Sequence, residues 1–539
     1  MYLGLGSLLA LVIQNLPFYL QDTTTAESRC LDLESTLNIE NTTILNVAYV
    51  RGDTRVQPQG TCAGEAHVSV SLCRVQYVTH TSARSAIHAE AWLPDEWYGR
   101  FLVAGNGGLG GCIPYNLLDY GSSMHFATIA ADNGHDGYTA VPFLHNDQVL
   151  QDFATRSIHI ASLTGKEILR TYYARPHAKS YFLGCSTGGR QGTYSAVHHA
   201  ENFDGILAGA PGTDWNHLMH WMGMLARAVG APNASKSASF IPPELWRVVA
   251  EEVMAQCDGL DGLEDGMISE PDECGFRPEV LLCGGARGNK ECLTPAQVDA
   301  LRTIYSPLYD AGQLVYPRFD PGSEGVGMPF TGEFPELLSQ WFKYGVINAT
   351  SYDFSTYGPA EGRLMDSINA GGIATWDGNM SAFRDRGGKY LTYHGQADWI
   401  VPAGNSKRQY SLVSSTMGLS TPEMDSFYRL FLAPGMAHCL DGPGAWDFGQ
   451  LGHAEAVTLW QSDLELTMGL RHAAAGNVHT PVRNDSAHNI LLALVDWVEG
   501  GMAPETITGT GDDGVERAHC RYPAVSMWDE ESEEWQCVM

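Results

Sequence analysis

A serine stands in a glycine-rich turn at residues 184–188, where the sequence is Gly-Cys-Ser-Thr-Gly. The G-x-S-x-G spacing is typical of a nucleophile elbow, a sharp turn from a strand into a helix that exposes a serine hydroxyl. Such a hydroxyl needs a base to take its proton and a third group to orient the base. The turn therefore predicts Ser186 as a nucleophile, although glycine and serine are also common in ordinary turns.

An acid and a base follow Ser186 in the chain order Ser, Asp, His of the α/β-hydrolases. Asp398 ends the segment 389–398, which we predict to be a strand leading into a polar loop. His438 lies near the end of a similar segment, 427–439. We therefore predict Asp398 as the acid and His438 as the base of a catalytic triad.

Other assignments of these two residues remain open from spacing alone. Asp398 could cap a turn, and His438 is one of nineteen histidines. Two further histidines lie nearby in the sequence. His394 precedes the acid, which is the wrong order, and no predicted strand leads into His453. The order and the strand-to-loop contexts favour Asp398 and His438.

An oxyanion site needs two hydrogen-bond donors close to the nucleophile. The backbone N–H of Thr187, directly after Ser186, is the first expected donor. The predicted strand 101–104 leads into the loop 105–111, which contains five glycines and whose backbone can approach a ligand closely. We expect the second donor from Gly107 or Gly108, the alternative being that this segment is only a flexible loop.

Two cysteines flank the predicted triad: Cys185 directly precedes Ser186, and Cys439 directly follows His438. If Ser186 and His438 meet, the two cysteines must also lie close together, which predicts a disulfide between the two loops. Two buried free thiols are the alternative. A thiol mechanism through Cys185 is a further alternative that a disulfide would forbid.

The segments around these residues alternate between helix and strand. Alternation is the sequence signature of an α/β fold with parallel strands, in which each helix crosses over one face of the sheet. An amphipathic helix is also expected close to the C-terminus. The predicted elements are strand–turn–strand 86–104, helix 157–174, strand 180–183, helix 190–199, strand 203–212 and helix 487–499.

Residues 214–385 differ from this rhythm, with scattered Trp, Met, Gly and Pro and four clustered cysteines. We interpret them as a domain inserted into a core formed by residues 22–213 and 386–539. Residues 1–21 carry no charged side chain and contain a short apolar run, as in a signal peptide, although a basic N-terminal region is missing. A partly buried N-terminal helix is the alternative for 1–21.

The composition excludes some classes of partner. With 32 basic and 62 acidic residues the chain has a formal net charge of −30. Such a charge repels nucleic-acid phosphates and anionic membranes, so we predict neither as a partner. The ordinary role of such a charge is to maintain solubility.

The twelve cysteines and five N-x-S/T sequons indicate an oxidising, extracellular location. Three pairs are close in sequence, as in local disulfide loops, and the absence of any C-x-x-C pair argues against a zinc site at these cysteines. We expect the remaining four cysteines to form disulfides as well. The close pairs are Cys257 with Cys274, Cys283 with Cys292, and Cys520 with Cys537; the remaining four are Cys30, Cys62, Cys73 and Cys112; the sequons are at Asn41, Asn233, Asn348, Asn379 and Asn484.

The chain resembles the fungal tannase and feruloyl esterase family over most of its length. The resemblance rests on these segments in family order: LPDEWYGRFL, GNGG, GCSTGGRQG, FDGILAGAPG, YHGQAD, PGMAHC, GPGAWDFG and ALVDWVEGGMAP. It implies an α/β-hydrolase core with a large inserted lid domain, and it assigns the triad and the linking disulfide to the same residues. No organic cofactor is implied.

The resemblance also implies a structural calcium site in the lid segment CDGLDGLEDGM, residues 257–267. Calcium takes six to eight oxygen ligands, which an Asp- and Gly-rich turn can supply. The segment lacks the register of an EF-hand, and without the resemblance an acidic, solvated turn would be the simpler interpretation. The implied ligands are the carboxylates of Asp258, Asp261 and Asp265 and the carbonyls of Leu263 and Met267.

The substrate class follows from the resemblance alone. It implies aromatic esters of hydroxycinnamic or gallic acid, as in plant cell-wall polysaccharides and tannins, and the elbow segment is more similar to the feruloyl branch. Tannase activity and an inactive hydrolase fold used for binding are the alternatives. Trp341 and Phe342 could contact a phenolic ring, although packing in the lid core is the simpler role.

Overall fold

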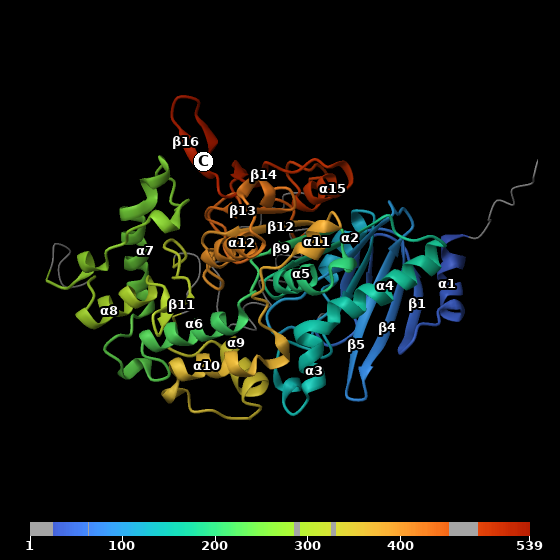
Figure 1. Cartoon of the computed structure of the whole chain (residues 1–539), viewed down its shortest axis with the longest axis horizontal. Helices are drawn as coiled ribbons and strands as arrows, with labels where there is room; N and C mark the ends of the chain where they lie inside the picture. The colour runs from blue at the N-terminus through green and yellow to red at the C-terminus, as the bar shows by residue number, and fades with distance from the viewer. Residues whose placement is uncertain (1–24, 63, 285–290, 325–329, 452–482) are drawn as a thin grey trace, which may run out of the picture.

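The computed structural model describes residues 25–62, 64–284, 291–324, 330–451 and 483–539 (Figure 1). The predicted signal segment 1–21 and His453 lie outside the described residues. A nine-stranded sheet runs through the core, flanked by helices on both faces, and the inserted segment forms a separate, mostly helical layer at one end.

The sheet has the strand order β1-β4-β5-β7-β6-β8-β9-β12-β13. Six strands from β7 to β13 are parallel, as predicted, whereas β1, β4 and β5 are antiparallel to their neighbours. The parallel strands therefore end along one edge, where an open α/β sheet places its ligand site. The strands are β1 Thr42–Val50, β4 Leu72–Ser82, β5 Ser85–Pro94, β6 Arg100–Ala104, β7 Phe126–Ala131, β8 Lys179–Cys185, β9 Gly205–Gly209, β12 Lys389–Gly395 and β13 Tyr428–Ala433.

Alternating side chains of the strands build a separate core on each face of the sheet. Phe182 belongs to a buried cluster that also contains side chains of helices α1, α4, α5 and α12 on one face. Its neighbours Tyr181 and Leu183 pack with α2 and α15 on the other. This period of two is the expected pleat of a strand buried on both faces. The helices are α1 Ala26–Thr36, α2 Tyr115–Ser123, α4 Ser157–Tyr173, α5 Thr187–His198, α12 Gly404–Met417 and α15 Ile490–Gly500.

The inserted segment is largely helical, and its hydrophobic core also includes Phe143, Phe153 and Trp399 from the surrounding fold. Its first helix, α6 (Trp215–Ala228), buries Leu218, Met219, Met222 and Leu225, which recur every three or four residues as on one helix face. This layer lies at the left of Figure 1. Its other elements are α7 Pro243–Cys257, α8 Pro295–Ile304, β10 Leu308–Asp310, β11 Gln313–Tyr316, α9 Glu336–Gln340 and α10 Pro359–Ile368. The last helix of the predicted insertion, α11 (Ser381–Asp385), instead packs against α5, because Phe383 belongs to the core on that face of the sheet (Figure 1).

Some elements were not predicted from the sequence. Helix α5 begins at Thr187, three residues earlier than the predicted 190–199, so it starts directly after Ser186. The C-terminal residues form two hairpins, and the second projects beyond the core near α7 (Figure 1). The remaining elements are β2 Thr54–Val56, β3 Ala66–Val68, α3 Asp147–Gln151, α13 Thr421–Met424, β14 Thr506–Thr510, β15 Glu516–Cys520, β16 Val525–Asp529 and β17 Glu534–Val538.

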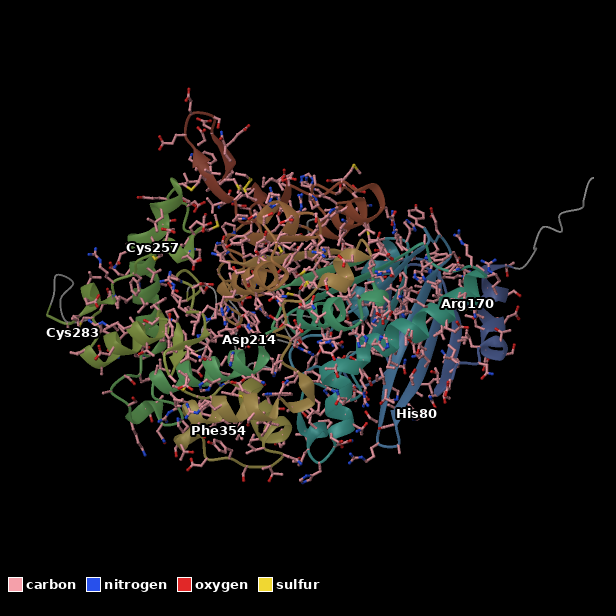
Figure 2. All side chains as sticks on the ribbon, viewed as in Figure 1. His80, Arg170, Asp214, Cys257, Cys283 and Phe354 are labelled. Atoms are coloured by element: carbon pink, nitrogen blue, oxygen red, sulfur yellow. A yellow bond between two sulfur atoms is a disulfide. The ribbon has the colours of Figure 1, made fainter. Side chains whose placement is uncertain are left out.

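Six disulfides join all twelve cysteines. In Figure 2, Cys257 and Cys283 lie in the lid, at the opposite end of the molecule from Arg170. Among the described residues we find no helix with the length and apolar character of a membrane span. The pairs are Cys30–Cys73, Cys62–Cys112, Cys185–Cys439, Cys257–Cys274, Cys283–Cys292 and Cys520–Cys537.

Candidate active site

Ser186 occupies a strained turn between β8 and α5. Its backbone has φ 63° and ψ −119°, a left-handed conformation that L-residues rarely adopt. Strain of this kind costs about 1–3 kcal/mol and is typical of functional turns. The Ser186 amide donates to the carbonyl of Gly209 at 2.9 Å, which fixes the turn to the end of β9. This is the local geometry of a nucleophile elbow.

Glycine allows a close approach of backbones next to the elbow. A Cβ atom on Gly188 would lie 2.9 Å from the carbonyl oxygen of Asn106. The loop after β6 can therefore lie directly against the first turn of α5, which a larger residue at position 188 would prevent.

Asp398 and His438 meet at the ends of neighbouring parallel strands, β12 and β13. Nδ1 of His438 lies 2.7 Å from Oδ2 of Asp398, and both side chains are buried. Oδ1 of Asp398 accepts hydrogen bonds from the amides of Ile400 at 2.9 Å and Val401 at 2.8 Å. This leaves the carboxylate fixed in place, as an acid that orients a catalytic base must be.

His394 is a second partner of the acid that sequence reasoning treated only as a competitor of the base. Its Nε2 lies 3.1 Å from Oδ2 of Asp398 and 2.7 Å from the carbonyl of Val401, and its Nδ1 lies 2.7 Å from the hydroxyl of Ser406. His394 therefore positions Asp398. In the sequence, this contact could have been inferred only from the position of His394 at the end of the same strand, four residues before the acid.

Asp398 is held in its charged form. Complete burial would raise the pKa of this carboxyl, but His438 and His394, which both contact it, hold the pKa below its ordinary value. The carboxylate can therefore stabilise a positive charge that develops on His438 during proton transfer.

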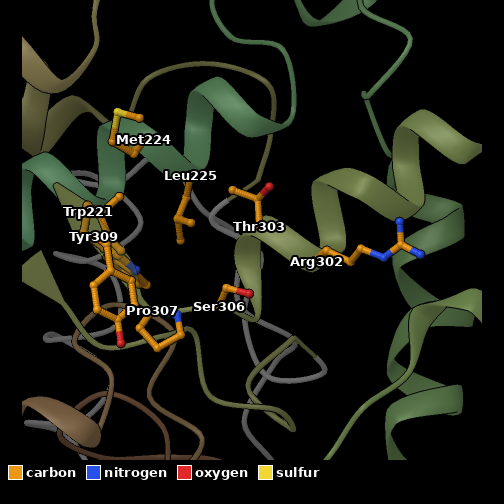
Figure 3. Close-up of a pocket in the computed structure, with 9 residues that line it drawn as sticks. Trp221, Met224, Leu225, Arg302, Thr303, Ser306, Pro307 and Tyr309 are labelled. Atoms are coloured by element: carbon orange, nitrogen blue, oxygen red, sulfur yellow. The ribbon is translucent and has the colours of Figure 1, made fainter. Parts of the chain in front are cut away.

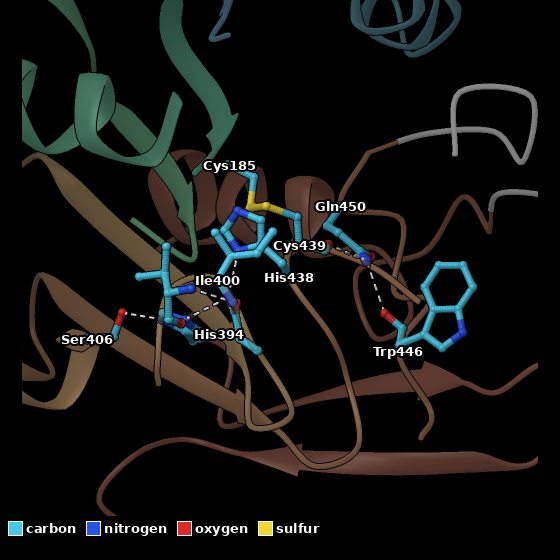
Figure 4. Close-up of a disulfide and its surroundings, with 10 residues drawn as sticks. Cys185, His394, Ile400, Ser406, His438, Cys439, Trp446 and Gln450 are labelled. Carbon is cyan, nitrogen blue, oxygen red and sulfur yellow. Dashed lines mark hydrogen bonds and ion pairs between the residues drawn. A yellow bond between two sulfur atoms is a disulfide. The ribbon is translucent and has the colours of Figure 1, made fainter. Parts of the chain in front are cut away.

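A disulfide joins the serine turn to the histidine loop. Cys185 and Cys439 are bonded with a Cα–Cα distance of 6.0 Å (Figure 4). Because Ser186 follows Cys185 and His438 precedes Cys439, the disulfide brings the serine turn and the histidine loop into one region. Gln450 braces the histidine loop, because its side-chain amide donates to the carbonyl of Cys439 at 3.3 Å and to that of Trp446 at 3.0 Å.

The acid loop and the histidine loop also touch through their backbones. The amide of Ala397 donates to the carbonyl of Met436 at 2.9 Å. A Cβ atom on Gly395 would lie 2.2 Å from the same carbonyl oxygen, so only glycine fits at this position. The distance between Asp398 and His438 is therefore fixed by main-chain packing.

The glycine loop keeps a few amides available for an oxyanion. Three amides of the loop, those of Gly105, Asn106 and Gly111, donate hydrogen bonds to other parts of the protein. The amide of Gly110 donates to a carbonyl within the loop. In this described loop, the amides of Gly107, Gly108 and Leu109 make no hydrogen bond. The hydroxyl of Thr187 donates to the carbonyl of Gly108 at 2.7 Å, which holds the loop against the expected first donor.

Gln191 positions this loop and was not singled out from the sequence. Its Oε1 accepts from the amide of Asn106 at 3.1 Å, and its Nε2 donates to Oδ1 of Asn133 at 3.0 Å. Because Gln191 lies in the second turn of α5, the helix that follows the nucleophile also sets the position of the predicted oxyanion loop.

Trp341 and Phe342 are both fully buried. Trp341 packs edge-on against Phe143, with ring centroids 6.3 Å apart, and against Trp215 at 5.6 Å. Both residues belong to the lid core, in agreement with the simpler of the two roles considered.

The residues of the expected calcium site share one acidic loop. Asp258 accepts from the amides of Gly266 and Met267, and Asp265 from that of Met267 at 3.2 Å. Asp261 accepts from the amide of Leu263 at 3.1 Å. The three carboxylates do not form a group whose oxygens all lie within 4.8 Å of one another.

The electrostatics of this loop nevertheless suit a cation. Burial raises the pKa of Asp265 to about 6; Arg517 opposes this shift, and the charges of Asp261 and Asp258 add to it. Arg517 lies 3.9 Å from Asp261 and offsets only part of the negative charge. The donor set of carboxylate and carbonyl oxygens therefore fits calcium in its chemistry.

The lid also contains an open pocket of about 390 Å³ between α6, α8 and the strand β10 (Figure 3). None of the predicted site residues lines it. The lining residues are Trp221, Met224, Leu225, Arg302, Thr303, Ser306, Pro307, Leu308 and Tyr309.

Comparison with known proteins gives consistent matches over most of the chain. The family model described as tannase and feruloyl esterase matches residues 73–538. A probable feruloyl esterase B-2 of Aspergillus flavus is 43% identical over 476 residues, which cover 86% of each chain. The crystal structure of feruloyl esterase B from Aspergillus oryzae superposes with a TM-score of 0.85 at 35% identity, covering 95% of this chain and 100% of that one.

A tannin acyl hydrolase from Aspergillus niger superposes with a TM-score of 0.70 at 20% identity, covering 95% of each chain. At this identity the likeness concerns the fold alone.

Proposed function

The chain belongs to the tannase and feruloyl esterase family, and from that premise we propose that this carboxylic ester hydrolase releases ferulate-type hydroxycinnamic acids from plant cell-wall esters. The observation that carries the proposal is the buried Asp398–His438 pair, joined by the Cys185–Cys439 disulfide to the strained turn at Ser186. The similarity to feruloyl esterase B supports the choice of acid.

In the first half of the reaction, His438 takes the proton of Ser186 while the serine oxygen attacks the ester carbonyl carbon. Asp398 stabilises the imidazolium that results. The amides of Thr187 and of Gly107 or Gly108 bind the oxyanion of the tetrahedral intermediate. When that intermediate collapses, the carbon–oxygen bond to the alcohol breaks and His438 gives the alcohol its proton, leaving an acyl-enzyme on Ser186.

In the second half, a water molecule replaces the alcohol. His438 takes a proton from the water as it attacks the acyl carbonyl, and the same amides bind the second oxyanion. Collapse breaks the bond between Ser186 and the acyl group, and His438 returns the proton to the serine oxygen. The products are the free aromatic acid and the regenerated enzyme.

The experiment that tests this proposal compares kcat/KM for methyl ferulate, methyl p-coumarate, methyl caffeate and methyl gallate. A cinnamate holds its ring two carbons farther from the ester than a gallate does, so a site shaped for one misplaces the carbonyl of the other. A misplacement of about 1 Å can cost on the order of a hundredfold in rate. We expect the three cinnamates to be cleaved faster than methyl gallate.

The remaining outcomes are equally informative. Faster cleavage of methyl gallate would assign the protein to the tannase branch. No cleavage of any of the four esters by correctly folded protein would favour an inactive hydrolase fold that binds its ligand.

We propose further that calcium binds the acidic lid loop through Asp258, Asp261, Asp265 and the carbonyls of Leu263 and Met267. A bound calcium ion would crosslink this loop and neutralise its carboxylates. The site serves stability, because its residues lie in the lid segment and not among the triad residues. Chelation by EGTA should lower Tm, and Asp261→Ala should reproduce that loss without added chelator. An unchanged Tm after complete exchange into EGTA would refute the structural site.

We also propose that the protein is secreted and glycosylated. Six disulfides are typical of an oxidising compartment, and the asparagines of all five sequons are exposed. A mobility shift on treatment with an endoglycosidase, and a mature N-terminus beyond residue 21, would support both parts of this proposal. Retention of the intact chain inside the cell would contradict secretion.

A further inference from the structure

Two histidines and a glutamate gather on the surface where the start of α4 meets the end of α5. His159 is the third residue of α4, His199 directly follows α5, and Glu201 lies in the short 3-10 helix Ala200–Asn202. One potential ligand atom from each lies within 4.8 Å of the others. Within the part of the chain that the structure describes, no other group of three or more His, Cys, Asp or Glu side chains meets this criterion.

We propose that His159, His199 and Glu201 bind a divalent transition-metal ion, with Zn²⁺ as the ion that the ligand set suits best. Two imidazoles and one carboxylate are a recurring zinc ligand set, and water fills the remaining positions at an exposed site. Calcium is a poor candidate, because it is a hard cation that takes oxygen ligands. The site is therefore distinct in chemistry from the acidic loop of the lid.

The two imidazole rings are already arranged side by side. Their centroids are 3.9 Å apart and their planes differ by 16°, so the rings are stacked face to face. Because an imidazole binds a metal in the plane of its ring, at least one ring must turn before both can bind the same ion. Nδ1 of His199 lies 3.9 Å from Oε1 of Glu201. Two atoms bound tetrahedrally to one zinc at about 2.1 Å are about 3.4 Å apart, so metal binding requires side-chain rotations that bring the three ligand atoms closer together.

Metal-binding histidines commonly donate a hydrogen bond from the ring nitrogen that does not bind the metal, and Asn202 can accept such a bond from His159. Its side-chain amide lies against Nδ1 of His159, with Oδ1 at 3.2 Å and Nδ2 at 3.1 Å. When the oxygen faces the ring, Nδ1 carries the proton and the lone pair of Nε2 is left for a metal. Asn202 is itself buried and anchored, because its carbonyl accepts from the hydroxyl of Ser180 at 2.9 Å.

The charge state of the cluster favours a cation. Glu201 is exposed and brings a negative charge that is free to reorient.

The position of the cluster indicates a structural role. Ser186 precedes α5 and His199 follows it, so the twelve residues of the helix separate them by about 18 Å. A metal at this place would not touch the substrate. It would instead clamp the start of α4 to the end of the helix that begins at the nucleophile.

Metal titration of protein without a polyhistidine tag tests the proposal, with calcium present in excess to occupy the acidic loop. We expect Zn²⁺ calorimetry to give one ion per chain and Co²⁺ to produce visible ligand-field absorption. At a hundredfold excess of Zn²⁺ over Kd, Tm should rise by about 2–3 °C. His199→Ala should weaken binding at least tenfold, and Glu201→Gln, at an exposed position that does not affect folding, should weaken it measurably.

His198→Gln is the matched control, because His198 is adjacent in sequence but packs its ring on Tyr194 at 4.3 Å. This variant should bind zinc as the wild type does. The proposal is overturned if the wild type binds no zinc, or if its binding survives both His199→Ala and His159→Ala unchanged. Loss of binding in His198→Gln alone would also overturn the assigned ligand set.

Discussion

Removing the Cys185–Cys439 disulfide should destabilise the protein more than removing any other, because this bridge closes by far the longest loop. Its cysteines are 254 residues apart, whereas those of Cys520–Cys537 are 17 apart. The chain-entropy relation gives about 5.5 kcal/mol for the first loop and about 3.1 kcal/mol for the second at 25 °C. Measured values reach about 5 kcal/mol, so we expect the two double variants to differ by about 2 kcal/mol.

The same comparison separates stability from catalysis. Cys185→Ala/Cys439→Ala releases the histidine loop from the serine turn, and a displacement of about 1 Å at a reacting group can cost a hundredfold in rate. We therefore expect kcat/KM for methyl ferulate to fall by about 10- to 100-fold. Cys520→Ala/Cys537→Ala removes a bridge in the C-terminal hairpins and should leave kcat/KM within about twofold of the wild type.

Urea unfolding followed by circular dichroism gives the stability difference, and initial rates on methyl ferulate, measured well below the unfolding midpoint, give the catalytic one. Full activity in folded Cys185→Ala/Cys439→Ala would refute the positioning role of the bridge. Equal destabilisation of the two double variants would refute the loop-length argument.

Three further changes probe the acid, the calcium loop and the lid. Asp398→Asn should lower kcat by about 10⁴-fold with little change in KM, because a neutral amide cannot stabilise the imidazolium; steady-state kinetics measures this. Burial raises the pKa of Asp265 to about 6, so calcium-free protein loses stability as the pH rises from about 4 to 6 and this carboxyl ionises. Over the same range fewer protons compete with calcium for the carboxylate. The Tm difference between calcium-loaded and EGTA-treated protein should therefore be larger at pH 7 than at pH 5. Burial alone would lower the pKa of His217, but Asp214 and Asp366, each 3.0 Å away, raise it to about 10. The charged His217 therefore stabilises the fold fully below about pH 6.5, and this stabilisation is lost as the pH rises towards about 10. The Tm difference between wild type and His217→Gln should shrink over that range.

The triad residues could be predicted from the sequence because each follows a strand that a short stretch of sequence is enough to indicate. The G-x-S-x-G turn needs only five residues, and the strands before Asp398 and His438 stand out as apolar runs that end in polar loops. Chain order then selected among the histidines. The pairing of Asp398 with His438 in the structure follows from the parallel alignment of β12 with β13.

The residues that position the triad and the glycine loop could not be predicted in the same way. His394 precedes the acid and was set aside by the order rule, yet its contact with Asp398 depends on how the loop after β12 folds back onto the strand. Gln191 reaches the glycine loop only because α5 lies against the loop after β6. Contacts of this kind depend on tertiary packing, which a single sequence does not encode in any short spacing.

The individual helices of the lid could not be predicted from the sequence, for a different reason. Residues 214–385 contain several short helices joined by long loops, and most of their apolar positions pack in a cluster that also includes Phe143, Phe153 and Trp399. Helical spacing is visible in α6, but Gly, Pro and aromatic residues interrupt the pattern elsewhere, so a domain could be predicted where its elements could not. The C-terminal hairpins were missed because their strands are short and partly exposed.

Covalent labelling by a fluorophosphonate tests the central claim most directly, since the reagent reacts with an activated serine in a hydrolase site. Intact mass should show one adduct per chain, peptide mapping should place it on Ser186, and Ser186→Ala should remain unlabelled and inactive towards methyl ferulate. An adduct on another residue, or no adduct on protein that cleaves methyl ferulate, would contradict the assignment of Ser186 as the nucleophile.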